Sequence, residues 1–265
     1  MAITRTTICD AWLRAAPDDP VWRRRALVLI FSVALVRLAC LALVPMALVP
    51  DEAYYWDWSR RLAWCYYSKP PMVAWLIALS TRLFGSHPPT VRLPAALLNI
   101  ATLTLVYALG RAMFSRVVGF LAAFIFAIVP ATVFLGLFMT IDAPLIACWI
   151  AALLCTWHAL ASGRLAWWCL AGCAAAAGVL TKQMMLVFPL VTFLMLAAIP
   201  AYRRECARPG VYIMTAVTLT ALAPILLWNA RHGWVTWQHT TEHFRGGRAW
   251  YAAFQTLGHF IGTQM

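Results

Sequence analysis

The segment that decides the fold class is an apolar run that leads directly into acids and aromatic residues. Residues 26–49 read ALVLIFSVALVRLACLALVPMALV, and residues 50–56 read PDEAYYW. About 20 apolar residues cross a hydrocarbon core as one α-helix, so the first run is long enough to span a membrane. Acids and aromatic rings at the edge of such a span are typical of a functional membrane surface.

The composition extends this conclusion to the whole chain. Of 265 residues, 63% are hydrophobic and 11% are charged, which is more apolar surface than a soluble core can conceal. The mean hydropathy is +0.77. A transmembrane barrel would show short alternating strands instead of long apolar runs. The sequence therefore predicts an all-α, polytopic membrane bundle.

Hydropathy predicts about seven membrane spans and an interfacial helix. The predicted spans are 26–49, 91–114, 117–137, 143–161, 165–180, 184–200 and 211–228, and a further helix is expected to start near Trp250. Residues 71–85 are apolar but too short to span, which favours an amphipathic helix on the membrane surface. The expected organisation is a cytoplasmic tail at 1–25 and a membrane module at 26–265, with 50–90 as its first outer loop.

The orientation follows from the arginines near the first span. Positive residues are balanced between the two sides, but Arg23, Arg24 and Arg25 adjoin the first span, which usually dominates topology. We therefore expect a cytoplasmic N-terminus that stays in the mature protein. The net charge of +12 lies mainly in loops and forms no basic stripe of the kind that binds nucleic acid. Anionic lipid or a phosphate-bearing substrate is the expected partner, and nucleic acid is not.

Several ionisable residues converge on the outer face of this topology. Asp51 and Glu52 follow the first span, Asp142 lies between the third and fourth spans, and both lysines of the chain, Lys69 and Lys182, fall on the same side. A carboxylate can orient or deprotonate an acceptor, and cations can neutralise a phosphate leaving group. Each residue alone is also compatible with an ordinary helix end that reaches water.

The motifs around these residues resemble a known family. They are Asp51-Glu52-x-Tyr54-Tyr55-Trp56, Tyr66-Tyr67-x-Lys69-Pro70-Pro71, Leu83-Phe84-Gly85, Val91-Arg92-Leu93-Pro94, Thr140-x-Asp142, Leu180-Thr181-Lys182 and Trp228-Asn229. Together they are similar to the polyprenyl-phosphate-sugar-dependent glycosyltransferases of the GT-C fold, which include protein O-mannosyltransferases and the lipid A aminoarabinose transferase.

The resemblance implies a site and a reaction. Asp51 and Asp142 are the expected catalytic acids, and Lys69 and Lys182 are expected to contact the donor phosphate. The remaining expected substrate-binding residues are Glu52, Tyr54, Tyr55 and Tyr67. The implied enzyme is a multi-pass protein of a bacterial inner membrane. It would transfer a sugar, with inversion, from a polyprenyl-phosphate donor to an extracytoplasmic lipid, glycan or protein acceptor.

The chain departs from the aminoarabinose transferase pattern at two positions. Ser68 stands where a glutamate commonly precedes Lys-Pro, and Tyr54 stands where the motif has a basic residue. Both changes argue against aminoarabinose transfer to lipid A and against a metal bound through that glutamate, although a divalent metal elsewhere stays open. Family members also continue through further spans and a soluble outer domain, so we expect a fragment.

Two other functions compete with this interpretation. His239-x-x-Glu242-His243 matches the H-x-x-E-H pattern of zinc peptidases, which makes His239 and His243 weak candidate metal ligands. Arg37, near the middle of the first span, favours a lipid or small-molecule transporter, because an intramembrane charge often marks a pathway. Transporters place their acids at mid-membrane, whereas Asp51, Glu52 and Asp142 lie at span ends. Of the cysteines outside the spans, Cys65 is expected to face outward.

Overall fold

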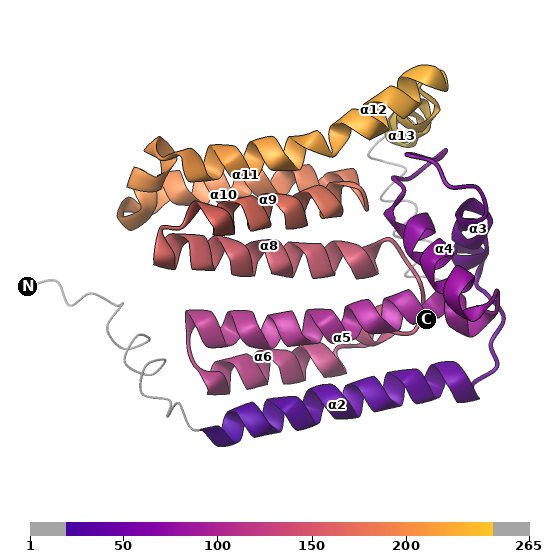
Figure 1. Cartoon of the computed structure of the whole chain (residues 1–265), viewed down its shortest axis with the longest axis horizontal. Helices are drawn as coiled ribbons and strands as arrows, with labels where there is room; N and C mark the ends of the chain where they lie inside the picture. Colours follow the sequence, from indigo (N-terminus) through magenta and orange to yellow (C-terminus); the bar gives the residue numbers. More distant parts are fainter. Residues whose placement is uncertain (1–19, 246–265) are drawn as a thin grey trace, which may run out of the picture.

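The regular structure of the chain is helical throughout the part that can be described. The computed structural model describes residues 20–245, except for the side chains of 242–245, and within this range it contains helices and no strands. The longer helices lie side by side as a bundle (Figure 1). The all-α membrane bundle predicted from composition is confirmed.

The described helices follow one another along the chain with short connections. They are α2 (Pro20–Leu43), α3 (Pro50–Ser59), α4 (Met72–Phe84), α5 (Pro88–Met113), α6 (Arg116–Ile128), α7 (Pro130–Leu135), α8 (Asp142–Ser162), α9 (Leu165–Val179), η1 (Gln183–Leu186), α10 (Val187–Ala198), η2 (Pro200–Ala207), α11 (Pro209–Thr220), α12 (Leu222–Arg231) and α13 (Val235–Arg245).

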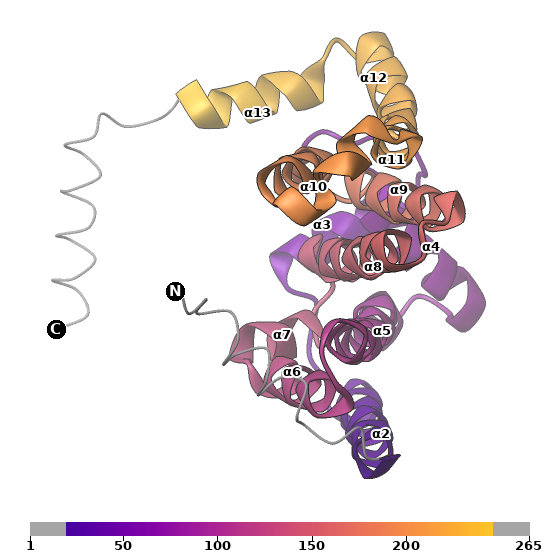
Figure 2. The same cartoon turned by 90° about the vertical axis from the view of Figure 1, so that its left-hand side faces the viewer.

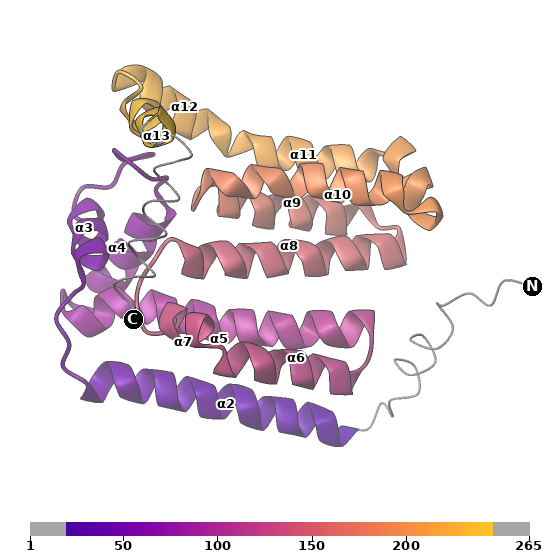
Figure 3. The ribbon, with the colours of Figure 1, turned by 180° about the vertical axis from the view of Figure 1, so that it is seen from behind.

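The two short helices α3 and α4 lie at one end of the bundle, which we call the α3 end (Figures 1 and 3). The loop before α8, the turn after α9 and the C-terminal part of α12 reach the same end. The turns between α5 and α6 and between α8 and α9 lie at the opposite end, together with η2. Helix α13 turns away from α12 (Figure 2). The order of the helices therefore gathers Asp51, Asp142 and Lys182 at the α3 end.

Four segments are long and apolar enough to cross a membrane. They are α2, α5, α8 and the continuous stretch Pro209–Arg231 formed by α11 and α12. Three other expected spans correspond to shorter apolar helices, Arg116–Ile128, Leu165–Val179 and Gln183–Ala198. The chain is thus a multi-pass membrane protein, but the expected count of seven full spans is not confirmed. The helix expected near Trp250 lies outside the described residues.

The first span begins and ends earlier than hydropathy predicts. Helix α2 covers Pro20–Leu43 instead of 26–49, and its last turn is followed by a bond from the N–H of Val44 to the carbonyl of Cys40. Pro45 disfavours a helical conformation at the residue before it, so the helix stops there although the sequence stays apolar. Residues 44–49 are consequently non-helical and run toward α3.

Helix α4 has one buried face and one exposed apolar face. Val73, Ala74, Ile77 and Ala78 are buried, whereas Leu79, Leu83 and Phe84 are 59%, 66% and 61% exposed. The expected helix over residues 71–85 is therefore present as Met72–Phe84. Its exposed apolar side chains are the kind that an interfacial helix buries in lipid.

Close packing between neighbouring helices depends on glycine at several contacts. A Cβ added at Gly119 of α6 would lie 2.6 Å from the carbonyl oxygen of Tyr107 in α5, and one added at Gly110 would lie 2.8 Å from the Cα of Gly119. Small residues allow backbones to approach in this way, and such approach drives helix association in membranes.

We expect Gly119→Ala to lower the melting temperature of the purified protein in detergent. The new methyl group cannot fit without moving the α5 backbone, and overpacking of this kind typically costs about 1–3 kcal/mol. Leu121→Ala is the matched control, since Leu121 lies on the same helix and is 47% exposed. An unchanged melting temperature in Gly119→Ala would show that α5 and α6 separate easily.

Candidate functional site

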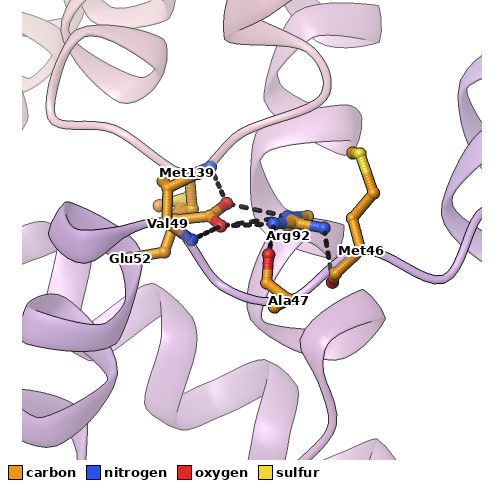
Figure 4. A network of polar contacts seen from close by, with 6 residues as sticks. All are labelled: Met46, Ala47, Val49, Glu52, Arg92 and Met139. Carbon is orange, nitrogen blue, oxygen red and sulfur yellow. Dashed lines mark hydrogen bonds and ion pairs between the residues drawn. The ribbon is translucent and has the colours of Figure 1, made fainter.

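A buried ion pair between α3 and α5 organises the α3 end (Figure 4). The Arg92 Nε donates to both carboxylate oxygens of Glu52 at 2.9 and 3.1 Å, and its Nη2 donates to Oε2 at 2.7 Å. Glu52 is 0% exposed and Arg92 is 3% exposed. The same guanidinium also donates to the carbonyls of Met46 and Ala47 at 3.2 and 2.7 Å. The pair therefore fixes the chain that enters α3.

The Glu52 carboxylate also accepts two backbone hydrogen bonds. The N–H of Val49 donates to Oε2 at 3.1 Å, and the N–H of Met139 donates to Oε1 at 2.9 Å. Both oxygens are thus occupied by protein groups, and Glu52 lies away from open solvent. Sequence analysis expected Glu52 to bind substrate; the structure instead places it where it holds the 136–141 loop, which leads into α8, against α3.

A second ion pair joins α8 to the turn after α9. Lys182 Nζ donates to Asp142 Oδ1 at 3.0 Å, and the two side chains are 33% and 44% exposed. Asp142 is the first residue of α8, where the positive end of the helix dipole favours a carboxylate. These two residues are 40 positions apart in the chain, so the contact depends on the fold.

Asp51 lies in the first turn of α3, next to the buried pair but exposed. Its neighbour one turn later is Tyr55, which is 6% exposed. The pKa of Tyr55 is raised to about 12, chiefly by burial and to a smaller extent by the charges of Asp51 and Asp142 and by the Tyr54 phenol. Both carboxylates therefore act on one phenol. The phenol is therefore neutral at physiological pH with a wide margin, and its hydroxyl remains a donor.

The connection between α3 and α4 carries Lys69 and is fastened to two other parts of the fold. The N–H of Tyr66 donates to the Lys69 carbonyl at 3.0 Å, and the N–H of Met72 donates to the Leu180 carbonyl at 3.0 Å. The second bond joins the start of α4 to the end of α9, two residues before Lys182. Lys69 is half-buried, and the described residues provide no ion-pair partner for its ammonium.

Cys65 belongs to a buried polar cluster, which corrects the expectation that it faces outward. Its side chain is 0% exposed and its Sγ lies 3.5 Å from the Thr236 hydroxyl, while the Asn229 Nδ2 donates to it at 3.6 Å. Thr236 also donates to the Tyr66 carbonyl at 2.7 Å. Burial raises the pKa of the Cys65 thiol, so it stays protonated. The cluster fastens the 60–70 loop to α12 and α13.

The other aromatic candidates lie on the outside of this assembly. Tyr54 is 41% exposed, with its ring 4.3 Å from that of Trp58, and Tyr67 is 47% exposed, with its ring 4.6 Å from His239. The side chain of His243 lies outside the described residues. Among the residues that are described, no three His, Cys, Asp or Glu side chains gather as a metal site would require.

Arg37 is buried inside the bundle instead of lining an open path. It is 6% exposed, and a Cβ at Gly136 would lie 2.9 Å from its Nε and 2.8 Å from the Asn99 Cγ. Gly136 therefore lets the Arg37 and Asn99 side chains reach the backbone after α7. Burial among α2, α5 and the 136–141 loop suits a packing role for this arginine better than a transport pathway.

Sequence reasoning missed three residues that build the site: Arg92 as the partner of Glu52, and Asn229 and Thr236 as partners of Cys65. Arg92 and Asn229 both stand inside motifs that resemble the family, Val91-Arg92-Leu93-Pro94 and Trp228-Asn229. Their presence in those motifs was the available signal. Thr236 has no such signal.

Comparison with known proteins places the chain in a family. The model of the dolichyl-phosphate-mannose-protein mannosyltransferase family matches residues 68–228, a range that contains Lys69, Arg92, Asp142 and Lys182. The chain belongs to this family. Residues 20–67, with α2, α3 and Asp51, precede the matched range.

The individual proteins that this chain resembles are also named as sugar transferases. The lipid A galacturonosyltransferase of Rhizobium johnstonii is 31% identical over 222 residues, which cover 83% of this chain and 46% of that protein. The undecaprenyl phosphate-α-4-amino-4-deoxy-L-arabinose arabinosyl transferase of Proteus mirabilis is 27% identical, over 65% of this chain and 34% of that protein. A putative mannosyltransferase of Bacillus subtilis is 30% identical over 136 residues, half of this chain and 19% of that protein.

The chain spans less than half the length of each of these relatives. No solved structure shows a significant match to it.

We expect Arg92→Gln to unfold the α3 end. The substitution leaves the buried Glu52 carboxylate without its charge partner, which typically costs about 3–5 kcal/mol. The measurement is thermal unfolding in detergent, supported by proteolysis of the 44–72 segment. Arg60→Gln is the control, because Arg60 makes a 3.9 Å ion pair with Asp57 in which both side chains are more than 60% exposed. Equal melting temperatures in the two variants would contradict the role given to the buried pair.

Proposed function

We propose that this chain forms the catalytic face of a membrane glycosyltransferase whose donor is a sugar linked to a polyprenyl phosphate. The observation that carries the proposal is the Lys182–Asp142 ion pair at the same end of the bundle as Asp51 and Tyr55. A partly exposed ammonium, a free carboxylate and a neutral phenol are the groups that this chemistry needs. Family membership and the relatives named above support the same class.

The proposed reaction is a single displacement with inversion at the anomeric carbon. The acceptor oxygen forms a bond to that carbon, the bond from the carbon to the donor phosphate oxygen breaks, and the electron pair leaves with the polyprenyl phosphate. Lys182 and Lys69 stabilise the phosphate charge that is released. Asp51 takes the acceptor proton if the acceptor is a hydroxyl group. A phosphate acceptor is already an anion and needs no base.

Asp142 holds Lys182 in position for this step. An ion pair whose members are 33% and 44% exposed contributes little stability, about 0–1 kcal/mol, so a donor phosphate can replace Asp142 at low cost. Asp142 would then be free to contact the sugar or the acceptor. Tyr55, whose pKa both acids raise, supplies a neutral hydroxyl, and the exposed Tyr54 and Tyr67 offer rings for the sugar.

The acceptor is proposed to be a lipid, glycan or protein on the outer face of a bacterial inner membrane. A lipid is the first candidate to test, because the relative from Rhizobium johnstonii is a lipid A galacturonosyltransferase. The α3 end would then face outward. In this proposal Lys69 and Lys182 supply the positive charge for the donor phosphate, and a divalent metal at the site is left open.

Lys182→Met is expected to weaken binding of a short-chain polyprenyl phosphate while preserving the fold. A charge-assisted hydrogen bond contributes about 1.5–3 kcal/mol, so affinity should fall roughly 10- to 150-fold. Lys182→Arg should be intermediate, because the charge remains but the donor geometry changes. Binding is measured in detergent by titration calorimetry.

The control for this experiment is Arg204→Met, which removes one positive charge at the opposite end of the bundle. Arg204 is exposed, so its loss should leave both affinity and melting temperature unchanged. Equal affinity in the wild type, Lys182→Met and Lys182→Arg would reject Lys182 as a phosphate ligand.

Asp51→Asn is expected to reduce sugar transfer to a hydroxyl acceptor by roughly 10²–10⁴-fold, the usual contribution of a general base. The change keeps the shape of the side chain and removes its basicity, so polyprenyl phosphate affinity should stay within twofold. Transfer is measured from a polyprenyl-phosphate-linked sugar to lipid A in proteoliposomes. Turnover at the wild-type rate would show that Asp51 is not the base.

A further inference from the structure

The end of the bundle that carries the proposed catalytic face contains a cavity between α3 and α4 with several polar side chains in its lining. Its volume is about 270 Å³, and its polar lining consists of Trp56, Ser59, Arg60, Thr81, Arg82 and Ser86. None of the residues assigned above to sugar transfer lines it. We propose that this cavity binds the phosphate of an anionic membrane lipid headgroup.

The donors in the cavity suit a phosphate. Arg60 and Arg82 are both exposed, and in the described part of the chain Arg82 has no ion-pair partner. Arg60 contacts Asp57 at 3.9 Å, a distance at which an exposed pair is weak. Two guanidinium groups that are free to bind an anion therefore border one hollow, and arginine is well matched to phosphate oxygens.

A third donor comes from the pairing of Trp56 and Ser86. The Trp56 Nε1 donates to the Ser86 Oγ at 2.8 Å, so the Ser86 hydroxyl hydrogen remains available for an anion. The hydroxyls of Ser59 and Thr81 instead donate to the carbonyls of Trp56 and Ile77, at 2.6 and 2.8 Å, and are not available to an anion. The Arg60 guanidinium also lies over the Trp56 ring, with its Cζ 5.3 Å from the ring centroid, and both residues line the cavity.

The surroundings of Arg82 indicate a lipid as the source of the phosphate. Leu79, Leu83 and Phe84 lie within one turn of Arg82 on α4 and are all more than half exposed. On the end of a membrane bundle, apolar side chains beside an arginine reach the acyl chains while the guanidinium stays among the headgroups. The cavity thus opens where lipid phosphates are concentrated. Asp57 lies 3.9 Å from Arg60, and its negative charge opposes binding of an anion.

The test measures lipid retained by the purified chain. The probe is phosphatidylglycerol, compared with phosphatidylcholine, and binding is followed by native mass spectrometry after detergent exchange. Arg82→Gln and Arg60→Gln should each lower phosphatidylglycerol affinity roughly tenfold or more, as expected for the loss of a charge-assisted hydrogen bond. Asp57→Asn should raise it. Arg82→Lys should be intermediate, because the charge remains but the fork of guanidinium donors is lost.

The matched control is Arg61→Gln, which removes an exposed positive charge from the neighbouring residue. Arg61 does not line the cavity, so its loss should change affinity less than twofold. Equal losses in Arg61→Gln and Arg82→Gln would reject a defined site in favour of diffuse charge. Asp51→Asn should leave this lipid binding unchanged, which separates the result from any failure of the proposed transferase.

A second arm distinguishes lipid from soluble phosphate. Glycerol 3-phosphate and inorganic phosphate are added as competitors at millimolar concentration. The proposal requires that neither soluble anion displaces phosphatidylglycerol from the protein. The acyl chains add affinity through the apolar residues of α4, and the soluble anions lack them. Displacement by either soluble anion would overturn the lipid assignment.

Discussion

The buried ion pair between Glu52 and Arg92 is the constraint on which the α3 end depends. A carboxylate and a guanidinium taken out of water are stable only while they stay together and while their remaining donors and acceptors are bonded. Here the pair binds the 46–49 segment and the N–H of Met139 as well. Three separate stretches of chain are therefore fixed by one charge pair. Asp51 and Asp142 are placed by the backbones that it holds.

Two further sets of hydrogen bonds, both between uncharged groups, join chain segments at the α3 end. The bond from Met72 to the Leu180 carbonyl sets the start of α4 against the end of α9, and the Cys65, Thr236 and Asn229 cluster sets the 60–70 loop against α12. The loop is consequently a bridge between distant helices instead of a free connection. Lys69 and Lys182 stand three and two residues from the ends of the first of these hydrogen bonds, so it brings the two chain segments that carry them together.

Hydropathy predicted which residues lie at the same end of the bundle, but it did not predict which of them are buried or where α2 ends. The alternation of apolar runs and short turns was sufficient to place Asp51, Asp142 and Lys182 at one end. It was insufficient to show that Glu52 is buried, because an acid at a span end has the same pattern whether it faces water or an arginine 40 residues away. The early end of α2 depends on Pro45, a local effect that averaged hydropathy does not register. The burial of Cys65 depends on Thr236, which lies 171 residues away.

The Glu52–Arg92 and Asp142–Lys182 ion pairs differ in how far water reaches them. Asp51 and Glu52 are adjacent in the first turn of α3, and a helix turns by about 100° per residue, so they face different surroundings. Glu52 faces inward and is saturated by bonds that are costly to break. Asp51 remains exposed. Asp142 and Lys182 form the other pair, which water reaches and which a competing anion can open. The proposed binding of a lipid phosphate at this face would use both properties: the buried ion pair stays closed and holds the helices, and the exposed ion pair can be opened by the phosphate.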